Sequence, residues 1–277
     1  MRSIPVFLLA SLLAAEADGA ILRVSTTGSG TNPFTWAGAF PSVSGAIDSA
    51  SAGDQIWVAS GRYNEAIQLT PKLSLFGGFT GTEAEGEFDL RDWHRNECVL
   101  DGSGLGSSVV IGATGVVLDG FTITGGRAGS EGGGGIRCAS CSIRLVNLLI
   151  TRNRVAFARG TSGGGGILCR NASATIVSCT VSFNSIRTLS PGSGDVSARG
   201  GGILCESSNL YTGKTSVVGN YVHLAESDSE ALGGGLYLRN SITHLGRTKI
   251  NENVVTARRS NNGRAGGGLT SAMRLSY

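Results

Sequence analysis

The chain has 277 residues, of which 44 are glycine, about twice the ordinary share of roughly 7%. The glycines cluster instead of recurring at every third position, 40% of the residues are hydrophobic and the net charge is only +3, so the composition excludes a collagen and a disordered tail. Glutamate and lysine are too scarce for a coiled coil. The clustering indicates that glycine is needed at particular positions of a folded chain.

Residues 1–20 have the features of a secretory signal peptide. Arg2 supplies the positive start, Ile4 to Ala15 form an apolar run, and a small-x-small cleavage site ends at Ala17. The run is shorter than the roughly 20 residues that cross a bilayer, although an uncleaved anchor is the alternative. We therefore expect a secreted or cell-surface protein, extracellular or at the outer membrane, with no transmembrane segment in the mature chain.

Residues 21–126 are predicted to form an N-terminal cap and irregular first coils. Short strands are expected at Gln55–Val58, Leu73–Phe76, Cys98–Asp101 and Ser108–Ile111. The stretch from Pro41 to Ala52 has apolar residues at helical spacing, which predicts a short amphipathic helix. Terminal units of repeat arrays need a cover, so we expect this helix to cap the first coil.

Residues 127–277 contain five glycine runs, each followed by an aliphatic residue. The runs with their aliphatic residues are Gly132–Ile136, Gly163–Ile167, Gly200–Ile203, Gly233–Leu236 and Gly266–Leu269. An asparagine follows 17 residues after the aliphatic residue in the first four units, at Asn153, Asn184, Asn220 and Asn253. The aliphatic residues themselves are 31, 36, 33 and 33 residues apart. A constant spacing within the unit and a variable one outside it indicate a rigid repeat joined by loops.

The repeats predict a solenoid. Alternating apolar positions and β-branched residues favour strands over helices, and units too small to bury their own apolar face must stack on one another. We therefore predict an all-β, single-stranded, right-handed parallel β-helix. The asparagines would form a structural ladder at a bend, and the glycines would lie where the chain turns into a strand. Leu118–Thr124 aligns with Leu145–Thr151, which extends the stack upstream.

The six cysteines are predicted to be mostly free and buried. Cys138, Cys169 and Cys205 occupy the same position in three successive units and would form an inward stack. A chain of this length can bury a large core without covalent staples. We therefore favour buried thiols over the disulfide framework that an exported protein with six cysteines also permits.

Several stretches resemble secreted bacterial right-handed parallel β-helix proteins with a pectin lyase-like fold. They are Ala52–Val58, Gly61–Tyr63, Phe76–Phe79 with Gly81–Glu83, Arg91–Trp93, Leu100–Gly102 and Asp119–Ile123. The glycine-glycine-apolar runs and Val181-Ser182-Phe183-Asn184 resemble the repeats of the chlamydial polymorphic outer-membrane proteins, although the other units replace the phenylalanine. The resemblance implies a surface or secreted, adhesin-like protein with a C-terminal anchor or barrel. The chain stops at Tyr277, inside a fifth unit, so we expect a truncated repeat region.

Enzymes that cut acidic polysaccharides also use this fold, but the repeats lack their chemistry. We find neither paired aspartates beside a Gly-His-Gly motif nor carboxylates stacked for Ca²⁺, so no catalytic residue is assigned. An acidic segment contains Glu83, Glu85, Glu87, Asp89 and Asp92. It could supply oxygen ligands to Ca²⁺, but a solvated loop is the expected state, and no metal or cofactor is predicted.

Charge and loop placement favour a binding role. Residues 127–277 carry 17 basic and 7 acidic residues, a net of +10, whereas residues 1–126 carry a net of −7. The segments after the asparagines (154–162, 185–199, 221–232 and 254–265) should emerge along one side of the stack as loops. Their candidate binding residues are Arg154, Arg159, Arg187, Arg199, Arg258, Arg259 and Arg264. We expect a structural or adhesive protein that binds a glycan or a cell-surface protein and no nucleic acid. The alternative is a lyase or glycoside hydrolase acting on an acidic polysaccharide.

Overall fold

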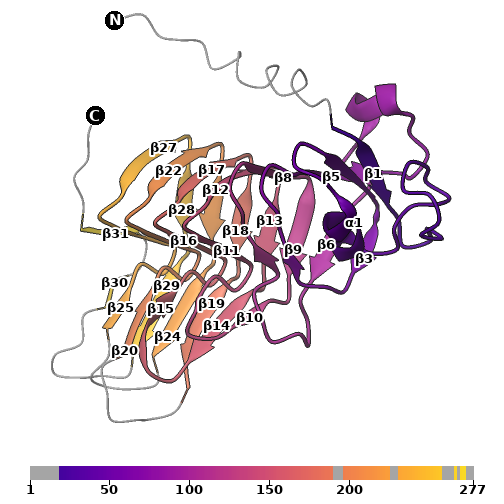
Figure 1. Ribbon diagram of the computed structural model, residues 1–277. Coiled ribbons are helices and arrows are strands. Elements are labelled where there is room, and N and C mark those ends of the chain that lie inside the picture. The colour runs from indigo at the N-terminus through magenta and orange to yellow at the C-terminus, as the bar shows by residue number, and fades with distance from the viewer. Residues whose placement is uncertain (1–18, 190–195, 225–229, 258–264, 267–268, 273–277) are drawn as a thin grey trace, which may run out of the picture.

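The computed structural model describes residues 19–189, 196–224, 230–257, 265–266 and 269–272. It is an all-β parallel solenoid, as predicted, and has about seven turns (Figure 1). The predicted signal peptide lies almost entirely outside the described residues. The right-handed path of the chain stays a prediction.

Three parallel sheets form the main solenoid, and most coils add one strand to each. Sheet A contains β1 (Ile21–Val24), β2 (Gln55–Ala59), β5 (Ser74–Phe79), β8 (Val116–Asp119), β12 (Ser142–Val146), β17 (Ser173–Val177), β22 (Asn209–Gly213) and β27 (Ile242–Gly246). Sheet B contains β3 (Gly61–Tyr63), β6 (Cys98–Asp101), β9 (Phe121–Thr124), β13 (Leu149–Thr151), β18 (Thr180–Ser182), β23 (Ser216–Val218) and β28 (Lys249–Asn251). Sheet C contains β4 (Ile67–Gln68), β7 (Val110–Ile111), β11 (Ile136–Ala139), β16 (Ile167–Arg170), β21 (Ile203–Glu206), β26 (Leu236–Arg239) and β31 (Leu269–Ala272).

Two further parallel sheets project from the main solenoid as a lateral lobe (Figure 1). Sheet D contains β10 (Arg127–Ala128), β14 (Arg154–Phe157), β19 (Ser185–Thr188), β24 (Tyr221–Leu224) and β29 (Val254–Ala257). Sheet E contains β15 (Gly160–Gly163), β20 (Val196–Arg199), β25 (Glu230–Leu232) and β30 (Ala265–Gly266). A full coil therefore visits sheets C, A, B, D and E in that order.

The lobe corrects the prediction that the segments after the asparagines are loops. Most of their described residues belong to strands of sheets D and E. Val155, Ile186, Val222 and Ala198 are buried in a core of the lobe's own, separate from the core of the main solenoid. These strands have only two to four residues, which is too short to show a period in the sequence, so their burial depends on the facing sheet.

The strand register confirms the predicted repeat. Ile136, Ile167, Ile203, Leu236 and Leu269 pair in successive strands of sheet C. The upstream alignment is also confirmed, because Leu118 pairs with Leu145 in sheet A and Ile123 pairs with Ile150 in sheet B. The constant offset in the sequence is therefore a constant path through three sheets.

The asparagine ladder lies where each coil bends from sheet B into sheet D. Asn184, which is fully buried, donates its side-chain N–H groups to the carbonyl of Ile150 (2.9 Å) and to Oδ1 of Asn220 (3.0 Å). Its own Oδ1 accepts from the backbone N of Asn153 (3.0 Å) and from that residue's Nδ2 (3.1 Å). Asn220 and Asn253 continue the same pattern. Each interior amide of the ladder thus uses its full hydrogen-bonding capacity.

The glycine runs lie directly across from this ladder, at the neck between the lobe and the main solenoid. The last glycine of each run faces the asparagine of its own coil: a Cβ on Gly135, Gly166 or Gly202 would be 2.8 Å from the asparagine Nδ2. The glycine before it faces the backbone of the residue that follows the asparagine. A Cβ added to Gly165, for example, would lie 2.8 Å from the carbonyl oxygen of Ser185. Glycine is therefore required where two passes of one coil meet, and this contact explains the fixed offset of 17 residues.

At the C–A, A–B and B–D corners, a single residue with left-handed backbone turns the chain. The C–A corner uses Ser140, Asn171, Ser207 and Asn240, the A–B corner uses Asn147, Ser178, Lys214 and Arg247, and the B–D corner uses Arg152, Phe183 and Glu252 besides Gly125 and Gly219. One residue at positive φ reverses the local twist and turns the chain sharply. Asparagine tolerates this conformation, whereas a bulky side chain such as that of Phe183 adopts it rarely.

Two helices accompany the first coils. The helix α1 (Val43–Ser49) forms where it was predicted, with Val43, Ala46 and Ile47 buried in the main core. Ser42 caps it by accepting a hydrogen bond from the backbone N of Gly45 (3.2 Å). Its role as a cap of the solenoid stays a prediction. The middle of the acidic segment forms a short 3₁₀-helix, η3 (Glu85–Leu90).

The cysteine prediction is confirmed for four residues and wrong for two. Cys98, Cys169, Cys179 and Cys205 are free and buried. Cys138 is buried in the inward stack, in register with Cys169, but it forms a disulfide with Cys141. The two bonded residues flank the C–A corner, where the left-handed Ser140 folds the chain back within three residues. Repeat position alone did not predict this local pairing.

Candidate functional site

The lateral lobe meets the main solenoid at two outer corners, and one of them is filled. Between sheets E and C, Leu168, Leu204 and Tyr237 form a small apolar cluster against Leu232. The guanidinium of Arg199 lies 5.4 Å from the centre of the Tyr237 ring. This corner is therefore part of the protein's own packing.

An ion-pair network closes the same corner. The Glu206 carboxylate is buried and lies 3.1 Å from Arg170, 3.5 Å from Arg199 and 3.4 Å from Arg239. Arg199 also bonds Glu230 at 3.1 Å. Each of these arginines therefore forms an ion pair with a carboxylate of the protein itself. Arg199, predicted as a binding residue, thus has partners within the fold.

The opposite corner, between sheets B and D, is open and forms a groove of about 480 Å³, which we call the B–D groove. It is lined by Arg62, Asp101, Ser103, Thr124, Gly125, Gly126, Arg127, Arg152, Arg154, Phe183 and Ser185. The outward faces of the two sheets and the left-handed corner residues contribute these side chains. Its chemistry is basic and rich in hydroxyl groups, with one aromatic ring.

Three arginines of the B–D groove have no carboxylate partner among the described residues. They are Arg127, Arg152 and Arg154. Arg127 and Arg154 occupy paired positions on neighbouring strands of sheet D, so two positive charges lie side by side on the same face. The Nε of Arg154 is buried without a hydrogen-bond partner. Like charges directly opposite on a sheet are unfavourable, and a buried N–H without an acceptor adds to that cost.

The single carboxylate of the B–D groove does not offset these charges. Asp101 pairs with Arg62 and accepts a hydrogen bond from the backbone N of Ser103 (2.9 Å). Burial alone would raise the pKa of Asp101, but the hydrogen bonds from Ser103 and the Arg62 guanidinium outweigh it and hold that pKa below its ordinary value. Asp101 therefore stays ionised and neutralises Arg62, which leaves the groove a net excess of three positive charges.

Of the seven arginines that the sequence proposed as one binding face, the structure describes four. Arg154 lines the B–D groove, Arg187 is exposed on the outward face of sheet D, and Arg159 is exposed in the turn between β14 and β15. Arg199 belongs to the E–C corner. Arg258, Arg259 and Arg264 lie outside the described residues. Arg154 and Arg187 share the outward face of neighbouring strands of sheet D, whereas Arg199 lies at the E–C corner.

Sequence reasoning missed Arg127, Arg152 and Phe183 as lining residues of the groove. A signal existed for the first of them, because the alignment of Leu118–Thr124 with Leu145–Thr151 continues for three more residues to Arg127 and Arg154. Arg152 and Phe183 precede ladder asparagines, where the sequence gives no sign of a left-handed backbone. Only the corner geometry brings them into the groove.

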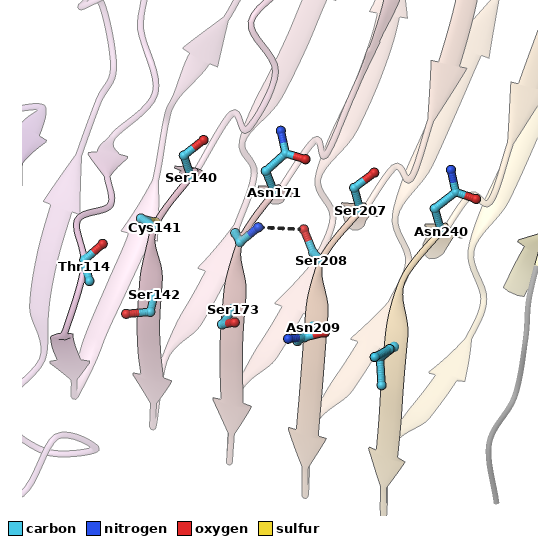
Figure 2. A pocket seen from close by; sticks show the side chains of 12 residues that line it. Thr114, Ser140, Cys141, Ser142, Asn171, Ser173, Ser207, Ser208, Asn209 and Asn240 are labelled. Carbon is cyan, nitrogen blue, oxygen red and sulfur yellow. Dashed lines mark hydrogen bonds between the residues drawn. The ribbon is translucent and has the colours of Figure 1, made fainter.

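A second groove, of about 540 Å³, follows the C–A corner. Figure 2 shows its side chains in regular rows, with Ser140, Asn171, Ser207 and Asn240 in one row and Ser142, Ser173 and Asn209 in another. The backbone N of Ala172 donates to the Ser208 hydroxyl at 3.0 Å within the groove. It is polar and uncharged, so it has no group that would draw a charged ligand toward it.

The described residues contain no cluster of three or more histidine, cysteine or acidic side chains able to hold a metal ion. Within the acidic segment, Glu83 is buried and accepts hydrogen bonds from the backbone of Thr80 (2.6 Å), Gly81 and Thr82 (both 3.0 Å). These bonds outweigh the effect of its burial and lower the pKa of Glu83. Its carboxylate therefore organises the local turn.

No helix in the described part of the chain is both long and apolar enough to cross a membrane. No protein-family profile, curated protein or solved structure matches the chain.

Proposed function

We propose that this chain is a secreted or cell-surface β-helix protein with a structural or adhesive binding role, and that an anionic partner binds in the B–D groove. The observation that carries the proposal is the pair of unpartnered arginines, Arg127 and Arg154, in register on neighbouring strands. The fold gains nothing from placing these like charges together, whereas an anion between them would relieve their repulsion. The predicted signal peptide and the resemblance to chlamydial surface proteins support the extracellular setting.

The contrast between the two lobe corners also supports binding. At the E–C corner the arginines face Glu206 and Glu230, and apolar side chains fill the remaining space. At the B–D corner only Asp101 is acidic, and the space stays open. A preformed concave surface with a few convergent charged groups is the usual form of a ligand site. The partner that fits this charge is a polyanion, such as an acidic glycan or an acidic protein surface.

The experiment is chromatography on immobilised heparin, with the salt concentration at elution as the readout. The Arg127→Ser, Arg154→Ser double variant should elute at lower salt and lose at least tenfold affinity, since each charge-assisted hydrogen bond contributes about 1.5–3 kcal/mol. The matched control is Lys214→Ser, Arg247→Ser, which removes two exposed charges from neighbouring coils at the A–B corner. Equal losses in both variants would show attraction to net charge without a specific groove.

The same polymers test the enzymatic alternative. Polygalacturonate and alginate are incubated with the protein, and new reducing or unsaturated ends are measured. We expect binding without cleavage. Release of such ends, abolished by the Arg127→Ser, Arg154→Ser variant, would replace the adhesive role with a lyase or hydrolase.

A further inference from the structure

The aromatic ring in the B–D groove is held in an unfavourable position. Phe183 is 64% exposed and has a φ of 53°. A bulky side chain rarely adopts left-handed backbone, and a large apolar ring gains nothing from facing water. The equivalent corner positions of the other coils carry Gly125, Arg152, Gly219 and Glu252, none of which is aromatic. Left-handed backbone by itself favours glycine or asparagine over an aromatic residue.

The Phe183 ring nevertheless packs against a neighbouring coil. A Cβ on Gly219 would lie 2.8 Å from the Phe183 ring, so the ring packs against the bare backbone of the next coil. Glycine there makes room for the ring, which is thereby fixed beside the arginines that line the same groove. A positioned aromatic side chain with one face supported and the other open is a common element of binding sites.

We propose that the B–D groove binds an acidic polysaccharide, with the Phe183 ring against the apolar face of a sugar ring and Arg127 and Arg154 on its carboxylate or sulfate group. This assignment rests on the proposed function and specifies its ligand. Guanidinium groups bind planar or tetrahedral oxyanions through two parallel hydrogen bonds, which suits both anions. The hydroxyl groups of Ser103, Thr124 and Ser185 line the same groove and can bond sugar hydroxyls.

Two other polyanions fit less well. An acidic peptide has no ring to cover Phe183, so the exposed aromatic side chain would stay unused. Single-stranded nucleic acid could stack a base there, but its sites usually offer several aromatic platforms along a basic path. The described lining residues supply one ring among hydroxyl groups. The geometry therefore favours a sugar polymer.

The test compares Phe183→Asn with the wild type for thermal stability and for affinity. The probes are an oligogalacturonate, a heparin oligosaccharide and a polyaspartate of matched charge. Asparagine tolerates left-handed backbone, so the melting temperature should stay equal or rise. Affinity for both saccharides should fall about tenfold, and affinity for polyaspartate should not change. Phe34→Asn is the matched control, since Phe34 is also exposed and lies outside the groove, and should bind as the wild type does.

The outcomes separate this inference from the proposed function. If no polyanion binds the wild type, the proposed function fails. If all three bind and Phe183→Asn weakens none of them, the groove binds anions but the sugar assignment is overturned. A lower melting temperature with unchanged saccharide affinity would show that the ring is structural. A single-stranded oligonucleotide that binds more tightly than either saccharide, and depends on Phe183, would overturn the ligand class.

Discussion

The contact between the glycine runs and the asparagine ladder can be tested with Gly166→Ala. The new Cβ would lie 2.8 Å from Nδ2 of Asn184 and 2.9 Å from the carbonyl oxygen of Gly202, closer than carbon atoms approach such groups. The backbone of Gly166 does not need positive φ, so the substitution adds volume without backbone strain. The loss of unfolding free energy therefore measures the steric contact between Gly166 and Asn184 across the neck.

The expected loss is about 2–4.5 kcal/mol of unfolding free energy. Forcing a methyl group into packed surroundings costs about 1–3 kcal/mol. Moving the Asn184 amide away would weaken its bonds to Ile150 and Asn220, at about 1 kcal/mol for each bond. Replacing glycine by alanine also lowers the conformational entropy of the unfolded chain, which offsets the loss of stability by about 0.4–1 kcal/mol.

The assay is urea denaturation, followed by circular dichroism, with Gly129→Ala as the control. Gly129 is exposed, has no positive φ and has no atom within 4 Å of an added Cβ, so its change should stay within about 0.5 kcal/mol. Asn184→Ala in the Gly166→Ala background makes room for the methyl group, so the double variant should be less destabilised than the sum of the single ones. Equal stability of Gly166→Ala and Gly129→Ala would refute the steric explanation.

Three other predictions follow from buried groups. Asn184→Asp should destabilise the protein by more than about 3 kcal/mol in denaturant titration, because a buried carboxylate cannot donate the two bonds that the amide donates. Thiol titration of the unreduced, denatured protein should detect four thiols of the six cysteines, and a count of six would contradict the Cys138–Cys141 disulfide. Burial raises the pKa of Cys98 from 9.0 to about 12, so the unfolded state ionises first and stability should fall as the pH rises from about 9 toward 12. Cys98→Ala should reduce that slope, and an unchanged slope would point to other groups.

The repeat, the aliphatic stack and the ladder were predictable because each depends on residues that recur at a fixed spacing. A buried amide that must bond to the coils on either side tolerates no other residue type, so Asn153, Asn184 and Asn220 are easily recognised in the sequence. The helix at residues 43–49 was predictable for a similar reason, since three apolar residues on one face meet the core. At these positions the residues that the sequence pattern predicts to be buried are buried in the structure.

The candidate site was only partly predictable. The sequence showed that the second half of the chain is basic, but charge alone does not tell which arginines have partners. Arg199 faces Glu206 and Glu230, whereas Arg154 has no carboxylate partner among the described residues. Glu206 follows Arg199 by 7 residues and Glu230 follows it by 31, and neither separation recurs in the other units, so the sequence does not show that these groups meet.

The sequence by itself determined the number of residues in each rigid unit, the stacking of the units and the positions that must be glycine or asparagine. These features follow from short-range rules: strand periodicity, backbone freedom and the capacity of an amide for hydrogen bonds. Only the tertiary structure decided that the remaining segments pair into a second set of sheets, and that one corner of the resulting lobe is filled while the other is open. The physical reason is that strands of two to four residues are buried only by packing against the opposite sheet. Whether these segments form strands therefore depends on contacts between several coils.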